Sequence, residues 1–170
     1  MDSFPAIEID KVKAWDFRLA NINTSECLNV AYGVDANYLD GVGVSITSIV
    51  LNNRHINLDF YIIADVYNDG FFQKIAKLAE QNQLRITLYR INTDKLQCLP
   101  CTQVWSRAMY FRLFAFQLLG LTLDRLLYLD ADVVCKGDIS QLLHLGLNGA
   151  VAAVVKDVEP MQEKAVSRLS

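Results

Sequence analysis

The sequence predicts an α/β fold with a mainly parallel sheet flanked by helices. Two observations lead to this prediction. Apolar residues make up 52% of a 170-residue chain, which is enough to form the core of one domain. Short, almost wholly apolar runs also alternate with segments of helical periodicity, as expected when each strand is covered on both faces. Strands are predicted at residues 28–34, 58–64, 84–91, 125–129 and 151–155. Helices are predicted at residues 41–51, 69–81, 104–119 and 139–145.

The first elements are defined by run length and spacing. Residues 1–24 mix charged and apolar positions and are interpreted as an N-terminal extension with a short helix at about 11–19. The run 28–34 is bounded by Asp35 and has the composition of a buried strand. Four apolar residues then recur at helical spacing and predict the first long helix: Val42, Ile46, Ile49 and Val50.

The later elements follow the same alternation. The run LDFYIIA predicts the strand 58–64, and Asn68 or Asp69 is expected to cap the helix after it. Beyond the strand at 84–91, a polar loop contains Pro100, and the helix 104–119 is expected to end at Gly120. Residues 25–170 are thus expected to form one unit, part of a single domain.

Composition excludes several classes of function. The formal charge is −3 and the basic residues are scattered, so a nucleic-acid partner is not expected. The N-terminus is acidic and interrupted by Pro5, unlike a secretory signal. The most apolar stretch, 108–121, is shorter than the ~20 residues that span a bilayer. Four cysteines without an export signal are expected to stay reduced, which favours a cytoplasmic location.

Two loops that follow predicted strands are the candidate functional positions, because ligands of such sheets bind beyond the C-terminal strand ends. They are residues 35–38 and 130–132. In an extended chain Asp130 and Asp132 project to the same side, with their Cα atoms roughly 7 Å apart. Their mutual repulsion would be relieved by a divalent cation, Mg²⁺ or Mn²⁺, with diphosphate oxygens as further ligands. Alternatively, both are solvated loop residues that cap the next element.

Other motifs are interpreted as structural. Gly41 and Gly43 suggest a dinucleotide fingerprint, but Ile46 stands where the third glycine would be, which disfavours a Rossmann oxidoreductase. The segment Cys98–Cys101 has redox spacing but follows a late strand and is interpreted as a loop feature. His55 and His144 are isolated and are assigned no function.

Three segments together resemble the glycosyltransferases of family 8, which have the GT-A fold, a Rossmann-like fold of nucleotide-diphospho-sugar transferases. The segment YLDADVV at 128–134 is similar to the family's aspartate-X-aspartate motif. The segment NVAYGVDANY at 29–38 resembles its opening nucleotide-binding strand, and SRAMYFRL at 106–113 resembles a third recurring segment, in which an arginine faces the donor. Within the family, the resemblance is greatest to bacterial lipopolysaccharide core hexosyltransferases, a glucosyltransferase in particular.

The resemblance implies a role for each site residue. It implies that Asp130 and Asp132 bind the metal and the diphosphate and that Arg112 reaches the donor; these three are the candidate catalytic residues. It also implies that Asp35 accepts a hydrogen bond from the uracil ring. The other residues implied to contact the nucleotide are Ala31, Tyr32, Asn37, Tyr38, Asp130 and Ala131.

The resemblance further implies a function. A hexose, with glucose favoured and galactose as the alternative, would pass from a UDP-sugar to the outer core oligosaccharide of lipopolysaccharide, with retention at the anomeric carbon. The enzyme would lie on the inner face of the bacterial inner membrane as a peripheral protein. Family members are considerably longer, and a third metal ligand, a histidine, and the acceptor site are expected in the C-terminal half. The other hypothesis is a truncated nucleotide-binding unit without transferase activity, poorly soluble because an apolar sheet face or edge is exposed.

Overall fold

The computed structural model describes residues 7–19, 27–102 and 106–156. Its centre is a five-stranded sheet with the strand order β1-β4-β3-β2-β5. β2 (Cys27–Val34), β3 (Asn57–Ala64), β4 (Arg85–Ile91) and β5 (Leu127–Tyr128) are parallel, and β1 (Ile9–Asp16) is antiparallel to β4. The predicted mainly parallel α/β sheet is confirmed.

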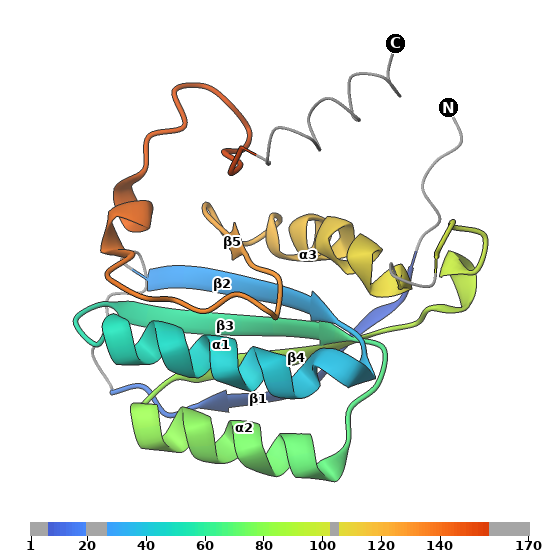
Figure 1. Ribbon diagram of the computed structural model, residues 1–170, viewed down its shortest axis with the longest axis horizontal. Helices are drawn as coiled ribbons and strands as arrows, with labels where there is room; N and C mark the ends of the chain where they lie inside the picture. Colours follow the sequence, from blue (N-terminus) through green and yellow to red (C-terminus); the bar gives the residue numbers. More distant parts are fainter. Residues whose placement is uncertain (1–6, 20–26, 103–105, 157–170) are drawn as a thin grey trace.

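Helices cover both faces of this sheet (Figure 1). α1 (Leu39–Asn52) connects β2 to β3, and α2 (Asp69–Asn82) connects β3 to β4, and both lie on the same face. α3 (Phe111–Leu119) lies on the opposite face, where it follows the 3₁₀ helix η4 (Arg107–Tyr110). The predicted N-cap of α2 is confirmed, since the Asn68 side chain accepts a hydrogen bond of 2.8 Å from Phe71 N.

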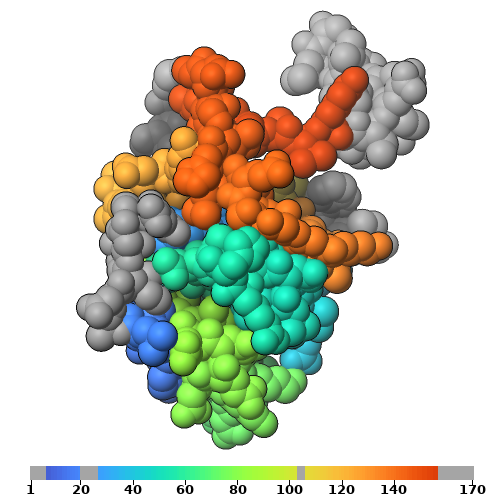
Figure 2. Space-filling view, turned by 90° about the vertical axis from the view of Figure 1, so that its left-hand side faces the viewer, coloured from blue at the N-terminus to red at the C-terminus, as the bar shows by residue number. Residues whose placement is uncertain are grey.

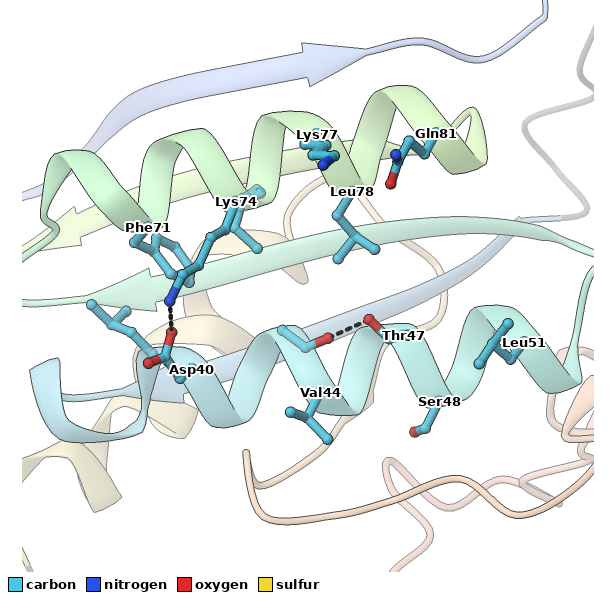
Figure 3. Close-up of a pocket in the computed structure, with 13 residues that line it drawn as sticks. Asp40, Val44, Thr47, Ser48, Leu51, Phe71, Lys74, Lys77, Leu78 and Gln81 are labelled. Atoms are coloured by element: carbon cyan, nitrogen blue, oxygen red, sulfur yellow. Dashed lines mark hydrogen bonds and ion pairs between the residues drawn. The ribbon is translucent and has the colours of Figure 1, made fainter.

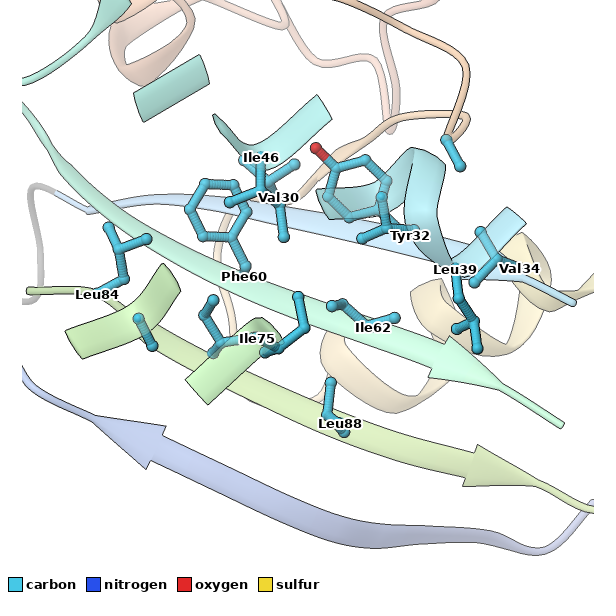
Figure 4. Close-up of a cluster of buried hydrophobic side chains, with 14 of the residues drawn as sticks. Val30, Tyr32, Val34, Leu39, Ile46, Phe60, Ile62, Ile75, Leu84 and Leu88 are labelled. Carbon is cyan, nitrogen blue, oxygen red and sulfur yellow. The ribbon is translucent and has the colours of Figure 1, made fainter. Parts of the chain in front are cut away.

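Two hydrophobic clusters hold these layers together. Under α1 and α2, alternate residues of β2 and β3 such as Val30, Tyr32 and Phe60 pack against Ile46 and Ile75 of the helices (Figure 4). The other alternate residues face α3, where Ala31, Tyr61 and Ile63 meet Phe111 and Phe114. The continuous apolar strands predicted from the sequence are therefore explained by burial on both sides.

The segment after β5 returns across α1 (Figure 2), and hydrogen bonds join the two. Asn52 Nδ2 donates to Cys135 O at 3.1 Å, and Cys135 N donates to the Ser48 hydroxyl at 2.9 Å. Ile139 N donates to Asn53 Oδ1 at 2.8 Å just before the 3₁₀ helix η5 (Ser140–His144). This segment is thereby anchored to the C-terminal half of α1.

The expected helix at 11–19 is wrong, because this segment forms β1, paired with β4. A bulge between Lys11 and Lys13 shifts the register, so the more buried residues Ile9, Val12 and Trp15 recur every third position. That spacing imitates one face of a helix and hides the period of two that identifies a strand.

The expected strand at 151–155 is also wrong. Val151 is 100% exposed and Val155 is 95% exposed, and neither pairs with another strand of the described residues. Apolar β-branched residues favour an extended chain, but a strand forms only beside a neighbour with free backbone groups. The predicted strand at 125–129 is shorter than expected. The predicted short helix at 139–145 is a 3₁₀ helix. The predicted start of the helix 104–119, at residues 104–105, lies outside the described residues.

A groove of about 720 Å³ runs between α1 and α2 (Figure 3). The surface that lines it is mainly apolar, and Lys74 spans its end to reach Asp40 at 2.7 Å. None of the candidate site residues lines it. In the described part of the chain, no helix combines the length and apolarity needed to cross a bilayer.

Candidate nucleotide-sugar site

The candidate site lies where the strand order changes direction. The chain proceeds from β2 to β3 to β4 on one side and then places β5 on the other side of β2. The loops that follow β2 and β5 therefore lie side by side at the C-terminal edge of the sheet, where ligands of such sheets bind. Asp35 follows β2 directly, and Asp130 follows β5 by two residues. The two loops chosen from the sequence are thus brought together.

The loop after β2 is ordered by the Asp35 carboxylate. Its Oδ1 accepts a hydrogen bond of 3.0 Å from Asn37 N, and this caps the 3₁₀ helix η2 (Ala36–Tyr38). Its Oδ2 accepts a hydrogen bond of 2.8 Å from the Ser106 hydroxyl. The side chains of Asn37 and Tyr38 are exposed, that of Tyr38 to 55%. Two exposed side chains with polar groups therefore follow a carboxylate that is held in place.

The aspartate pair is held by the residue between its members. Ala131 is buried, and its carbonyl oxygen lies 3.0 Å from the position that a Cβ on Gly41 would occupy. The absence of a side chain at Gly41 thus allows this loop to lie directly on the first turn of α1. Asp130 and Asp132 are both exposed on either side of Ala131. The packed alanine fixes the backbone and leaves the two carboxylates at the surface.

Arg112 connects the third predicted segment to this pair. Its Nη2 donates to Asp130 Oδ1 at 2.9 Å, and its guanidinium carbon lies 5.3 Å from the centre of the Tyr128 ring. Arg112 Nε is buried and has no partner among the described residues. Burial raises the pKa of the Tyr128 hydroxyl, and the nearby guanidinium opposes this effect. The Arg112 side chain is nevertheless 43% exposed beside Asp130, and its accessible guanidinium group is suited to bind an anionic oxygen.

Ala31 and Tyr32 lie differently from the other predicted residues, because both side chains are fully buried. Ala31 faces the α3 cluster, and its carbonyl accepts from Leu129 N at 3.0 Å, extending the pairing of β2 with β5. The Tyr32 hydroxyl shares a hydrogen bond of 3.0 Å with Ser45 in the core beneath α1. These two side chains support the walls of the site and do not reach its surface.

Two residues near the site were not singled out from the sequence. Ser106 donates to Asp35 and accepts from Ala108 N at 3.4 Å, so it joins the β2 loop to η4. Asp65 follows β3 in register with Asp35, and its buried Oδ1 has no partner among the described residues. Burial, and secondarily the negative charge of Asp35, raises the pKa of the Asp65 carboxyl. The rule that selected the other two loops, a polar residue directly after a strand, would have identified Asp65 as well.

The donor atoms of the aspartate pair suit a divalent cation. Asp130 and Asp132 offer exposed carboxylate oxygens, which are the ligands preferred by Mg²⁺ and Mn²⁺. The described residues contain no group of three or more side chains able to hold a metal ion. These two carboxylates therefore fit part of a coordination shell, to which a diphosphate could add oxygens.

Comparison with solved structures defines the fold. The galactosyltransferase LgtC, solved with donor and acceptor sugar analogues, superposes with a TM-score of 0.58 over 68% of this chain and 41% of its own, at 19% identity. The bifunctional glycosyltransferase WbbM superposes with a TM-score of 0.57 over 76% of this chain and 23% of its own, at 22% identity. The protein thus has the GT-A fold of glycosyltransferases, as predicted.

Sequence comparison defines the family. The model of glycosyl transferase family 8 matches residues 29–169, and the chain belongs to this family. It is 39% identical to the lipopolysaccharide 1,2-glucosyltransferase of Escherichia coli over 96% of this chain and 46% of the relative. It is 38% identical to the lipopolysaccharide 1,3-galactosyltransferase of Salmonella typhimurium over 85% of this chain and 43% of the relative. The predicted family is confirmed, as is the predicted similarity to lipopolysaccharide hexosyltransferases, and the chain spans about half the length of these relatives.

Proposed function

We propose that this chain is the nucleotide-sugar-binding part, over residues 25–170, of a retaining transferase. It would move a hexose from a UDP-sugar to the outer core oligosaccharide of lipopolysaccharide. The single observation that carries the proposal is the ion pair of Arg112 with Asp130 beside the loop of Asp35, at the point where the strand order reverses. Ligands of open α/β sheets bind at such a point. The lipopolysaccharide transferases named above support the choice of acceptor.

The exposed groups have complementary chemistry for the donor. Asp35 can accept a hydrogen bond from the N–H of a uracil ring, and the exposed ring of Tyr38 can stack on the base. Arg112 can transfer hydrogen bonds from Asp130 to diphosphate or sugar oxygens when the donor enters. Asp130 and Asp132 would hold a divalent cation, which supplies Lewis-acid stabilisation of the leaving diphosphate when bound.

Glucose is the proposed sugar, because the glucosyltransferase relative aligns over a larger share of this chain than the galactosyltransferase does. Galactose is the second candidate at almost equal identity. A nucleotide-binding unit that does not itself transfer sugar is the alternative function, because the described residues supply only part of a metal coordination shell. The proposed place of action is the inner face of the bacterial inner membrane, where the lipid-linked acceptor would be met.

Calorimetric titration of UDP into the purified chain tests the site. We expect binding with Mn²⁺ that is at least tenfold weaker in chelator or in Asp130→Asn/Asp132→Asn, a loss of about 1.4 kcal/mol or more. The matched control is Asp138→Asn, which removes an exposed carboxylate from the same segment and should leave the affinity unchanged. Equal affinity of the double variant and the control would remove the aspartate pair from the proposed site.

Titration with the two complete donors tests the sugar. UDP-glucose is expected to bind more tightly than UDP-galactose, and the reverse order would contradict the choice of glucose. Mass spectrometry of the reaction mixture with a lipopolysaccharide core acceptor separates the two functions. Addition of one hexose supports transfer, whereas metal-dependent UDP binding without product supports the nucleotide-binding unit.

A further inference from the structure

The loop between β4 and η4 carries two thiols, those of Cys98 and Cys101, that the proposed function does not use. Both are exposed and free, and the chain bends at Leu99 between them. The Cys98 thiol donates weakly to Lys95 O at 3.4 Å. A Cys-X-X-Cys spacing on an accessible bend lets the two sulfur atoms meet after a local change of the loop.

The other two cysteines differ from this pair in environment. Cys27 is buried, and desolvation raises the pKa of its thiol to about 12. Cys135 is half-buried, and its thiol donates to Gly137 O at 3.0 Å. Because the thiolate is the nucleophile in disulfide exchange, oxidation is directed away from Cys27 and toward the exposed pair.

The same loop anchors the element that leads into the candidate site. Arg107 donates to Leu96 O at 3.1 Å and to Gln97 O at 3.3 Å, just before Cys98. The Tyr110 hydroxyl donates to Pro100 O at 2.9 Å, between the two cysteines. Both side chains belong to η4, which Ser106 precedes and Arg112 closely follows. A change in the loop is therefore transmitted to η4 through these hydrogen bonds.

We propose that Cys98 and Cys101 form a reversible thiol–disulfide site that controls the anchorage of η4. The oxidant is a low-molecular-weight disulfide such as oxidised glutathione. One protein thiolate attacks a glutathione sulfur and releases one glutathione thiolate, forming a mixed disulfide. The second protein thiolate attacks the protein sulfur of that bond and releases the second glutathione. Two protein thiols lose two protons and two electrons, and one glutathione disulfide becomes two thiols.

Mass spectrometry of the native chain after incubation with oxidised glutathione tests the covalent step. The expected product is lighter by two hydrogens and has a peptide linkage between Cys98 and Cys101. Cys27 and Cys135 should still be alkylated after denaturation, and dithiothreitol should restore the original mass. In Cys98→Ser, a stable glutathione adduct on Cys101 should replace the internal bond. Persistent adducts on the unmodified chain, or no reaction at Cys98 and Cys101, would overturn the proposal.

Hydrogen exchange of the segment 106–113 tests the anchorage, independently of nucleotide binding. Closing the disulfide moves the Pro100 carbonyl, so exchange should become roughly fivefold faster, as expected for one net hydrogen bond lost. Tyr110→Phe removes the same hydrogen bond without thiol chemistry. Its segment 106–113 should therefore exchange at the same rate in the reduced and the oxidised protein, and this rate should be similar to that of the oxidised parent. The coupling is refuted if oxidation leaves the exchange rate of this segment unchanged in the parent chain. It is also refuted if oxidation accelerates exchange in Tyr110→Phe as much as it does in the parent.

Discussion

Asp65 is the carboxyl group of this edge of the sheet whose environment least favours its charge. It lies beside Asp35, half-buried, with one buried oxygen unpaired among the described residues. Exposed carboxylates such as Asp130 keep their hydration, whereas Asp65 loses part of it on folding. The ionised form of Asp65 is therefore expected to be a source of instability next to the candidate site.

We predict that Asp65→Asn stabilises the chain at neutral pH. The pKa of the Asp65 carboxyl is raised in the folded state, so its contribution to stability is fully present below the unfolded value and lost as the pH rises through the folded value. The melting temperature of the variant should exceed that of the parent at pH 7. The difference should shrink as the pH falls toward about 4, the ordinary range of an aspartate.

The control for this prediction is Asp10→Asn, at an exposed carboxyl on β1. Thermal melts of both variants between pH 4 and pH 7, monitored by circular dichroism, supply the comparison. A lower melting temperature of Asp65→Asn at pH 7 would show that the carboxylate has a stabilising partner, and the prediction would be wrong.

The sequence placed candidate residues at the correct edge of the sheet where chemistry and position coincide, and the roles assigned to them stay predictions. Asp35 and Asp130 were chosen because they follow predicted strands, and Arg112 was chosen by resemblance; Arg112 lies within hydrogen-bonding distance of Asp130. Tyr32 was chosen by resemblance, but strand alternation directs its side chain into the core, where it bonds Ser45. Ser106 could not be paired with Asp35 from sequence, because the contact spans 71 residues and depends on where η4 begins.

At the scale of elements, the site depends on how closely α3 approaches β2. A Cβ on Gly33 would lie 2.7 Å from Phe111 Cβ and 2.8 Å from the Tyr128 hydroxyl. These contacts are shorter than packed atoms allow, and Phe111 Cβ is fixed to the helix backbone. Glycine at this position is therefore what lets the start of α3, with Arg112, lie over the strands that carry the site.

We predict that Gly33→Ala destabilises the chain by about 1–3 kcal/mol, because the added methyl group forces α3 away from β2. It should also weaken UDP binding, since Arg112 moves with the helix. Gly43→Ala is the matched control: nothing lies within 4 Å of its Cβ position, and it is inside α1. There alanine should stabilise by about 0.5–1 kcal/mol. The free energy of unfolding of both variants is measured by urea denaturation. An equal change in the same direction in both variants would contradict the prediction.

Elements were predictable where local pattern and tertiary context agree. α1, α2, β2, β3 and β4 were predicted within a few residues, because each has the periodicity of its own class and a complete set of neighbours. β1 was missed because its bulge breaks the alternation that marks a strand. The segment 151–155 has the composition of a strand but no neighbouring strand among the described residues. Local composition cannot predict whether a neighbouring strand is present.

At the scale of the whole molecule, the edge opposite the site is closed by one buried carboxylate. Asp59, near the start of β3, is 1% exposed. Arg18, just after β1, donates to it at 3.3 Å, and Arg85 at the start of β4 donates to it as well. Burial raises the pKa of the Asp59 carboxyl, and the two guanidinium groups oppose this. One side chain thus joins β1, β4 and β3, and it holds the antiparallel edge strand to the parallel core.

We predict that Asp59→Ala destabilises the chain by about 3 kcal/mol, since removing one partner leaves buried charge uncompensated. The side chains of Arg18 and Arg85 are 13% and 30% exposed, so water partly solvates the charges that remain. The loss of stability is therefore expected at the lower end of the range for buried ion pairs.

The matched control is Asp40→Asn, which breaks an ion pair whose lysine and aspartate are 69% and 78% exposed. That loss should not exceed about 1 kcal/mol. Urea denaturation gives both values. If both variants lose a similarly small amount of unfolding free energy, Asp59 does not hold the strands together. If only Asp59→Ala loses a large amount, this one carboxylate is what attaches β1 to the rest of the sheet.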